Sequence, residues 1–210
     1  MIIKSAKFVV SQSDSKMCKD YNCPEIAIVG KSNVGKSSFI NMVTSSSKLA
    51  KTSSTPGRTR LINYFEINGG EFMFVDLPGY GFAKVTDEEK VKWGSMIEGY
   101  LANKFGRIVN VLVLIDIRRT PDKLDKQMVT YLHYYNLPFT IIATKADKLS
   151  RMQQQKQKQI IANELGVGRD NIIITSCLDK VGIKETLDRI EVILDANKAE
   201  NLPSEDEENQ

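Results

Sequence analysis

Apolar positions along the chain form two kinds of segment, short continuous runs and longer stretches with one apolar face. The short runs are rich in β-branched residues and predict strands at residues 8–10, 25–29, 62–67, 72–76, 109–116, 139–144 and 171–175. The longer stretches predict helices that begin at residue 38 and that span 87–105, 122–135, 151–165 and 183–196. Strands that alternate with helices predict a three-layer α/β fold, in which a mostly parallel sheet carries helices on both faces.

Two polar segments indicate where the compact part of the chain begins and ends. Residues 11–24 are interpreted as a loop, which joins strand 8–10 in an N-terminal extension over residues 1–24. Residues 203–210 carry four acidic residues and no basic one, so residues 198–210 are predicted to form an acidic, disordered tail. One globular domain is predicted between them, over residues 25–197.

The composition is that of a soluble globular protein, with 41% hydrophobic and 26% charged residues. No apolar run approaches the roughly twenty residues needed to span a membrane, and the first residues lack the apolar core of a signal peptide. A cytoplasmic location and no membrane partner are therefore expected. The formal charge of +3 becomes +7 without the four acids of the tail, which hints at RNA or another polyanion.

The cysteines favour free thiols over a metal site. Cys18, Cys23 and Cys177 are odd in number and unevenly spaced, and His133 is the only histidine in the sequence. Because a zinc site needs four ligands with regular spacing, reduced thiols are the favoured interpretation.

A glycine-rich motif, Gly-Lys-Ser-Asn-Val-Gly-Lys-Ser, occupies residues 30–37 between a predicted strand and a predicted helix. The pattern G-x-x-x-x-G-K-S in this context predicts a phosphate-binding loop. Gly30 and Gly35 let the backbone wrap closely around an anion, which successive N–H groups and the helix dipole then hold. We expect Lys36 to reach the β- and γ-phosphates and the Ser37 hydroxyl to bind Mg²⁺. The loop alone does not distinguish ATP from GTP.

Two more segments are expected at the carboxyl edge of the sheet, where open α/β sheets bind ligands. Residues 44–60 are rich in Ser, Thr, Lys and Arg and predict a mobile surface loop. A threonine in its segment 55–59 can complete the Mg²⁺ shell and sense the γ-phosphate. Asp76, at the end of a predicted strand, can hold Mg²⁺ through water, and Gly79 can donate its N–H to the γ-phosphate.

Two later segments predict selectivity for guanine. Residues 144–147, Thr-Lys-Ala-Asp, directly follow a predicted strand. The Asp147 carboxylate can accept hydrogen bonds from N1–H and the exocyclic amine of guanine, which adenine lacks in that place. The stem of Lys145 can lie along the base, and backbone N–H groups of residues 175–177, Thr-Ser-Cys, can reach the guanine O6. Together with the phosphate loop, these segments predict a guanine-nucleotide switch.

These motifs, in this order, resemble the EngB (YsxC/YihA) family of bacterial ribosome-assembly GTPases, within the translation-factor-related P-loop GTPases. The likeness runs from about Phe8 to Ala196 and rests on residues 30–37, 52–59, 76–85 and 144–149. The stretch through Tyr80-Gly81 is specific to the family, whereas GTPases in general share the other motifs. The resemblance implies a Ras-like G domain with the P-loop NTPase fold, Mg²⁺-dependent GTP hydrolysis, a role in large-subunit ribosome assembly and an association with normal cell division and septation.

The resemblance also implies the residues of the site. Lys36, Thr59 and Gly79 are the expected catalytic residues. Mg²⁺ is expected to bind Ser37 and Thr59 directly and Asp76 through water. The expected GTP-binding residues are Gly30, Lys31, Ser32, Asn33, Val34, Gly35, Lys36, Ser37, Ser38, Gly57, Arg58, Thr59, Arg60, Leu61, Asp76, Leu77, Pro78, Gly79, Thr144, Lys145, Ala146, Asp147, Thr175, Ser176 and Cys177. The expected partners are GTP or GDP and the rRNA of the large ribosomal subunit, and a monomer is the default.

How hydrolysis is assisted is left open by the sequence. Tyr80 stands where Ras-type enzymes have a water-orienting glutamine, and packing or a partner contact is favoured over catalysis for it. Unaided turnover is therefore expected to be slow. Asn33 carries two alternatives: it resembles the asparagine with which some GTPases bind K⁺, or it stabilises the loop turn.

Three functions remain as alternatives. The protein is an enzyme that times a ribosome-bound step, or a binding module that reads GTP and GDP as signals while hydrolysis is incidental. An ATP-using P-loop kinase is a third interpretation, against which Asp147 argues. A second open choice concerns the basic residues expected near the nucleotide edge, which form either an rRNA-facing patch or ordinary surface charge: Arg58, Arg60, Lys84, Arg118 and Arg119.

Overall fold

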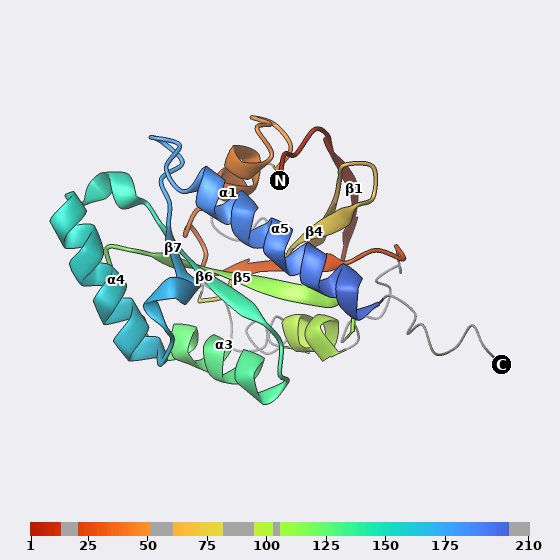
Figure 1. Ribbon diagram of the computed structural model, residues 1–210. Helices are drawn as coiled ribbons and strands as arrows, with labels where there is room; N and C mark the ends of the chain where they lie inside the picture. The colour runs from red at the N-terminus through yellow and green to blue at the C-terminus, as the bar shows by residue number, and fades with distance from the viewer. Residues whose placement is uncertain (14–20, 51–60, 82–94, 103–105, 202–210) are drawn as a thin grey trace.

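The computed structural model describes residues 1–13, 21–50, 61–81, 95–102 and 106–201. Seven strands form one sheet in the order β1-β3-β4-β2-β5-β6-β7 (Figure 1). Neighbouring strands from β4 through β2, β5 and β6 to β7 run parallel. β3 runs antiparallel to both of its neighbours, β1 and β4. The strands are β1 (Ala6–Gln12), β2 (Glu25–Gly30), β3 (Ile62–Ile67), β4 (Phe72–Asp76), β5 (Ile108–Asp116), β6 (Phe139–Thr144) and β7 (Ile172–Ile174).

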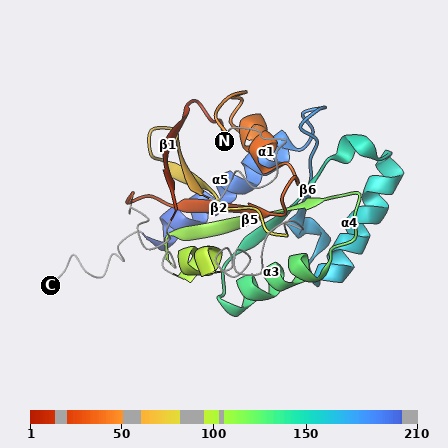
Figure 2. The ribbon, with the colours of Figure 1, turned by 180° about the vertical axis from the view of Figure 1, so that it is seen from behind.

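Helices cover both faces of the sheet, as the order of elements predicted. The named helices are α1 (Lys36–Val43), α3 (Lys123–Tyr134), α4 (Arg151–Leu165) and α5 (Ile183–Glu200), with short 3₁₀ turns at η2 (Ala146–Lys148) and η3 (Arg169–Asn171). Residues 95–102 form a further helical segment. In Figures 1 and 2, α1 and α5 lie on one face and α3 on the other. No helix among the described ranges combines the length and the apolar character that crossing a membrane requires.

The alternation of side chains along β2 divides the core into two layers. Ile26 and Ile28 pack with residues of α1 and α5, whereas Ala27 and Val29 pack with residues of α3, α4 and segment 95–102. Successive side chains of a strand point to opposite faces, so a strand covered on both sides is apolar throughout. All six residues of β2 are buried, which agrees with its place in the middle of the sheet.

Most predicted elements match the structure closely. The ranges predicted for β3, β4, β6 and α4 are confirmed to the residue. The predicted end of the last helix is wrong: α5 continues from residue 196 to Glu200, because no glycine or proline interrupts it before Pro203. Of the helix predicted over 87–105, only residues 95–102 fall in the part that the structure describes, and they are helical.

Candidate nucleotide site

The phosphate-loop motif lies where the sequence predicted it, between the end of β2 and the start of α1. Gly35 precedes the first helical residue, Lys36, and has a positive φ of 108°. Residues with a Cβ rarely adopt such a φ, so glycine is needed at this bend. The first N–H groups of α1 have no partner within a helix and therefore face the loop as anion-binding donors.

Two residues of the Thr-Lys-Ala-Asp motif hold the phosphate loop from the end of β6, which β5 separates from β2 in the sheet. The Thr144 hydroxyl lies 2.8 Å from the Val34 carbonyl oxygen and donates a hydrogen bond to it. The Lys145 ammonium donates to the Asn33 carbonyl oxygen at 2.7 Å. The motif predicted to select the base thus also fixes the shape of the loop predicted to bind phosphate.

Asp76 and Gly79 lie beside Lys36, on the other side of the loop. Asp76 is 3% exposed, and its Oδ1 atom has no hydrogen-bond partner. Burial raises the pKa of Asp76, while the Lys36 charge and a hydrogen bond from Asn63 oppose the rise. A side chain at Gly79 would place its Cβ 3.1 Å from the Lys36 ammonium nitrogen and 3.0 Å from Ser32 Oγ, so only glycine fits without displacing these atoms.

The base-side residues meet at the ends of β6 and β7. The Ala146 N–H donates to the Thr175 carbonyl at 3.0 Å, and the Ser176 hydroxyl donates to Asp147 Oδ1 at 3.0 Å. A hydrogen bond from the Lys148 ammonium lowers the pKa of Asp147, and the Ser176 hydroxyl adds to this effect. Asp147 is therefore ionised at neutral pH and acts as a hydrogen-bond acceptor, as guanine recognition requires.

Other predicted site residues lie at the margin of this arrangement or outside the described residues. Leu61, just before β3, is 36% exposed. Burial raises the pKa of the Cys177 thiol, and the charge of Asp147 adds to the rise. Cys177 is a free cysteine. The remaining predicted contacts fall outside the part of the chain that the structure describes: Gly57, Arg58, Thr59 and Arg60. The same holds for Lys84 of the predicted basic patch and for Cys18.

Asp116 belongs to the site, although sequence reasoning did not single it out. It ends β5 and accepts hydrogen bonds from Arg118 Nε at 2.8 Å and Nη2 at 2.6 Å. Its Oδ2 also lies 3.0 Å from the Lys145 ammonium nitrogen. Burial opposes ionisation, yet the bonds from Arg118 and Lys145 outweigh it and hold the pKa of Asp116 far below its usual range. The guanidinium of Arg118, considered for an rRNA-facing patch, is thus engaged within the chain.

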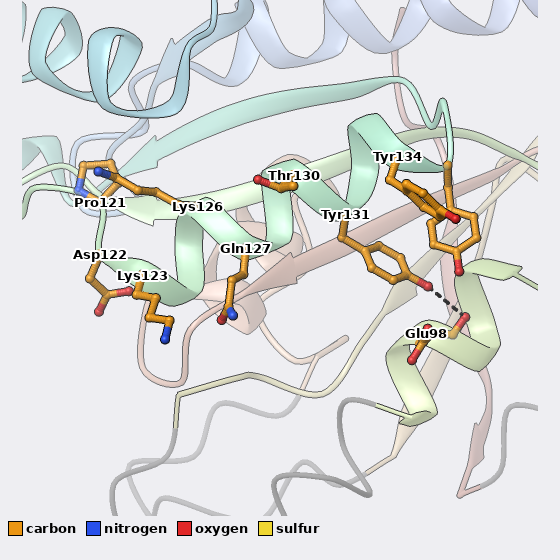
Figure 3. Close-up of a pocket in the computed structure, with 10 residues that line it drawn as sticks. Glu98, Pro121, Asp122, Lys123, Lys126, Gln127, Thr130, Tyr131 and Tyr134 are labelled. Atoms are coloured by element: carbon orange, nitrogen blue, oxygen red, sulfur yellow. Dashed lines mark hydrogen bonds between the residues drawn. The ribbon is translucent and has the colours of Figure 1, made fainter.

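Two cavities flank this region. One, of about 420 Å³, lies against the phosphate loop between Asn33, Asp116 and Lys145. The other, of about 680 Å³, extends along the outer side of α3 from Asp122 to Tyr135, away from the predicted nucleotide contacts (Figure 3). The larger cavity therefore does not mark the nucleotide site, which the loops at the carboxyl edge of the sheet define instead.

Comparison with known proteins identifies the family. A family model described as 50S ribosome-binding GTPase matches residues 25–145. A probable GTP-binding protein EngB from Desulforamulus reducens is 48% identical over 187 residues, which cover 89% of this chain and 91% of that protein. The chain belongs to the EngB family of GTP-binding proteins. A second EngB protein, from Clostridium perfringens, is 46% identical over 90% of this chain and 95% of its own length.

Solved structures place the fold of this EngB-family chain among the P-loop GTPases. The crystal structure of a probable GTP-binding protein EngB aligns with a TM-score of 0.69 at 22% identity, covering 82% of this chain and 99% of the other. Era in complex with MgGDPNP and 16S ribosomal RNA nucleotides aligns with a TM-score of 0.60 at 23% identity, covering 80% and 55%. The predicted three-layer P-loop GTPase fold is confirmed.

Proposed function

We propose that the protein is a Mg²⁺-dependent GTPase of the cytoplasm whose nucleotide state controls its binding to the large ribosomal subunit. Binding of a guanine nucleotide is supported by one observation: the same edge of the sheet holds Lys36, Gly79, Lys145 and Asp147. The ribosomal part is supported by the family model, which describes a 50S ribosome-binding GTPase. The family resemblance extends the proposal to cell division and septation.

The residues around Asp76 suit a magnesium ion. Asp76 is a buried carboxylate with an unpartnered oxygen, and it lies near enough to Lys36 to interact with its charge. Ser37 follows Lys36 in the first turn of α1. A buried acceptor without a donor is costly unless a ligand or ion completes it. Ser37 would hold Mg²⁺ directly and Asp76 through water, with Thr59 as the third protein group. When bound, the ion would neutralise charge that develops on the phosphates.

Hydrolysis is proposed to rest on electrostatic stabilisation by the chain. Lys36 would bind the β- and γ-phosphate oxygens, and the Gly79 N–H would donate to the γ-phosphate. Thr59 would sense the same phosphate from its loop. The Tyr80 hydroxyl donates to Asp125 Oδ1 at 3.1 Å, so it is engaged away from this reaction centre. We therefore expect slow unaided turnover, completed by a partner or an ion.

Single-turnover GTP hydrolysis, measured with and without purified large subunits, separates two functions. Strong stimulation by the subunit supports an enzyme that times a ribosome-bound step. The engaged Tyr80 hydroxyl favours the second candidate, a nucleotide-gated binding module with incidental hydrolysis, which the subunit would not accelerate. If ADP displaces bound GDP at equal concentration, guanine selectivity and both functions are overturned.

The role of Asn33 is tested in the same assay by exchanging the monovalent cation. Asn33 has a positive φ of 63°, which asparagine tolerates in tight turns, and its side chain is exposed. The positive φ fits a loop-stabilising role, and the exposure of the side chain leaves its amide oxygen accessible to K⁺. Faster turnover in KCl than in NaCl at matched ionic strength supports a K⁺ site, whereas equal turnover supports the turn role alone.

Co-sedimentation with large ribosomal subunits tests the partner. The protein is loaded with a non-hydrolysable GTP analogue or with GDP, and each mixture is repeated at raised salt, because basic surfaces bind RNA unspecifically. Binding that requires the GTP analogue and survives salt supports the proposal. Binding that ignores the nucleotide, or that disappears with salt, overturns the ribosomal part and leaves the nucleotide part standing.

A further inference from the structure

A cluster of charged and hydroxyl groups links Tyr80, the residue after the Asp-Leu-Pro-Gly segment 76–79, to the phosphate loop. It consists of Tyr80, Lys31, Asp122 and Asp125, and we refer to it as the Tyr80 latch. The Asp125 carboxylate accepts a hydrogen bond from the Tyr80 hydroxyl at 3.1 Å and one from the Lys31 ammonium at 2.7 Å. Lys31 also lies 2.5 Å from an oxygen of Asp122. Three separate segments of the chain thus meet at one carboxylate.

Burial makes these contacts mutually dependent. Asp125 is 4% exposed and Tyr80 is 9% exposed, so neither group can replace a lost partner with bulk water. Asp125 Oδ2 also accepts the Asp122 N–H at 3.1 Å, as part of the capping box at the start of α3. A buried carboxylate is tolerated only while it is paired and hydrogen-bonded, so removing one donor disturbs the others.

The backbone of Tyr80 is tied to the phosphate loop as well. The Ser32 N–H donates to the Tyr80 carbonyl at 3.0 Å, and the Tyr80 N–H donates to the Gly30 carbonyl at 3.3 Å. These bonds form a parallel bridge between Lys31 and Tyr80. The neighbouring residue Gly79 lies against Lys36 and Ser32. Side-chain and backbone contacts therefore both hold Tyr80, the residue that directly follows Gly79.

We propose that Tyr80 and Asp125 are positioning residues, which hold the Gly79 N–H in place for the γ-phosphate and so strengthen the binding of GTP but not of GDP. The inference rests on the proposed nucleotide function. Neither side chain needs to touch the nucleotide, because both act through the position of Gly79. The γ-phosphate is the group that GTP has and GDP lacks, so loss of the latch weakens GTP binding and leaves GDP binding unchanged.

The test is Tyr80→Phe, which removes the hydroxyl and keeps the ring. Affinities of the full-length protein for a non-hydrolysable GTP analogue and for GDP are measured by titration with fluorescent nucleotides in Mg²⁺. We expect the affinity for the GTP analogue to fall about tenfold, the effect of losing a hydrogen bond to a charged group. The affinity for GDP is expected to stay within about twofold. Equal loss for both nucleotides, or no change for either, overturns the inference.

Tyr100→Phe is the matched control. The Tyr100 hydroxyl donates to the Glu25 carboxylate at 2.6 Å, and both groups are buried. This bond has the same chemistry as the one in the latch, but Glu25 begins β2 while the phosphate loop follows its end. Tyr100→Phe is expected to leave the ratio of the two affinities unchanged. A ratio that shifts as much as in Tyr80→Phe would show a general effect of losing a buried hydroxyl and would overturn the inference.

A double-mutant cycle tests the pairing itself. The double variant Tyr80→Phe with Asp125→Ala is expected to lower the affinity for the GTP analogue no further than the stronger single variant. Both changes break the same hydrogen bond between Tyr80 and Asp125. Additive losses overturn the pairing. If Asp125→Ala fails to fold, Asp125→Asn replaces it, since the amide keeps the volume of the side chain and removes the negative charge that pairs with Lys31.

The wild-type measurement separates this inference from the proposed function. If the unaltered protein binds neither GDP nor the GTP analogue, the proposed function fails. If it binds both nucleotides, and Tyr80→Phe binds each of them as tightly as the wild type does, only the positioning role of the Tyr80 latch is overturned.

Discussion

Asp147 illustrates how a single residue is prepared for its role by its neighbours. Its two carboxylate oxygens face the Ser176 hydroxyl at 3.0 Å and the Lys148 ammonium at 2.9 Å. Each oxygen can accept more than one hydrogen bond, so these contacts orient the carboxylate and still leave capacity for a base. Lys145, two residues earlier, contacts the phosphate loop through the Asn33 carbonyl oxygen. Recognition of base and of phosphate is thus built from adjacent residues.

Asp147→Asn is expected to lower the affinity for GDP about 100-fold or more, because the amide replaces one of the two acceptor oxygens that face guanine with a donor NH₂ group. Fluorescent GDP titration measures the loss. Asp179→Asn serves as the control, since Asp179 also lies within 3.3 Å of the Ser176 hydroxyl but stands outside the Thr-Lys-Ala-Asp motif. If Asp179→Asn weakens GDP as strongly as Asp147→Asn, the base-recognition role of Asp147 is wrong.

At the scale of elements, α3 and α4 begin in the same way but serve different contacts. Both helices carry capping boxes, formed by Asp122 with Asp125 in α3 and by Ser150 with Gln153 in α4. A capping box satisfies backbone N–H groups that the first turn of a helix leaves free. Only the box of α3 also binds Lys31 of the phosphate loop. The start of α3 is therefore both a helix cap and a support of the site.

Asp122→Ala and Ser150→Ala are each expected to lower the free energy of unfolding by about 1 kcal/mol, the usual effect of losing an N-cap. Urea denaturation measures this common effect. Amide hydrogen exchange separates the two variants: Asp122→Ala is expected to speed exchange at Ser32 and Tyr80, because Lys31 loses one anchor. Ser150→Ala is expected to leave these amides unchanged. Equal exchange in both variants would contradict a link from α3 to the loop.

At the scale of the whole molecule, the topology gathers the carboxyl ends of the parallel strands at one edge. β2, β4, β5 and β6 end at Gly30, Asp76, Asp116 and Thr144. A parallel sheet brings such ends together although they are far apart in the sequence. Acidic and basic groups therefore concentrate at this edge, and their pairing makes the stability of the fold depend on pH.

Asp116→Asn is expected to destabilise the protein at pH 7, and the difference from wild type is expected to shrink in acid. The pKa of Asp116 is lower in the folded protein than its ordinary value of 3.8. Its stabilising effect is thus fully present above that value and is lost as pH falls toward the folded pKa. Because the side chain reaches solvent, we expect an effect of at most about 1 kcal/mol.

Urea unfolding of both proteins at pH 7 and near pH 3 measures this dependence. Arg118→Gln removes the principal partner of Asp116 and should show the same trend with pH. A difference between Asp116→Asn and wild type that stays constant over this range would contradict an effect from ionisation.

Local pattern was sufficient to predict much of this protein. The phosphate loop, the two strands β3 and β4 and the strand before the Thr-Lys-Ala-Asp motif follow from glycine positions and from apolar runs, which act over a few residues. The same signals placed Asp76 and Asp147 at strand ends, and they predicted two helix-covered faces. The predicted end of α5 at residue 196 was wrong, since fraying and continuation of a helix depend on weak preferences.

Only the tertiary structure decided which distant side chains meet. Tyr80 and Asp125 are 45 residues apart and Lys31 and Asp125 are 94 apart, so no local pattern indicates their contact. Asp125 could be read from the sequence as a residue in the first turn of a helix, but its second role arises where α3 packs beside the phosphate loop. Sequence determined the elements and the nucleotide motifs through local propensity and spacing. The fold determined the support of those motifs, because burial and charge pairing act between segments that only the sheet topology brings together.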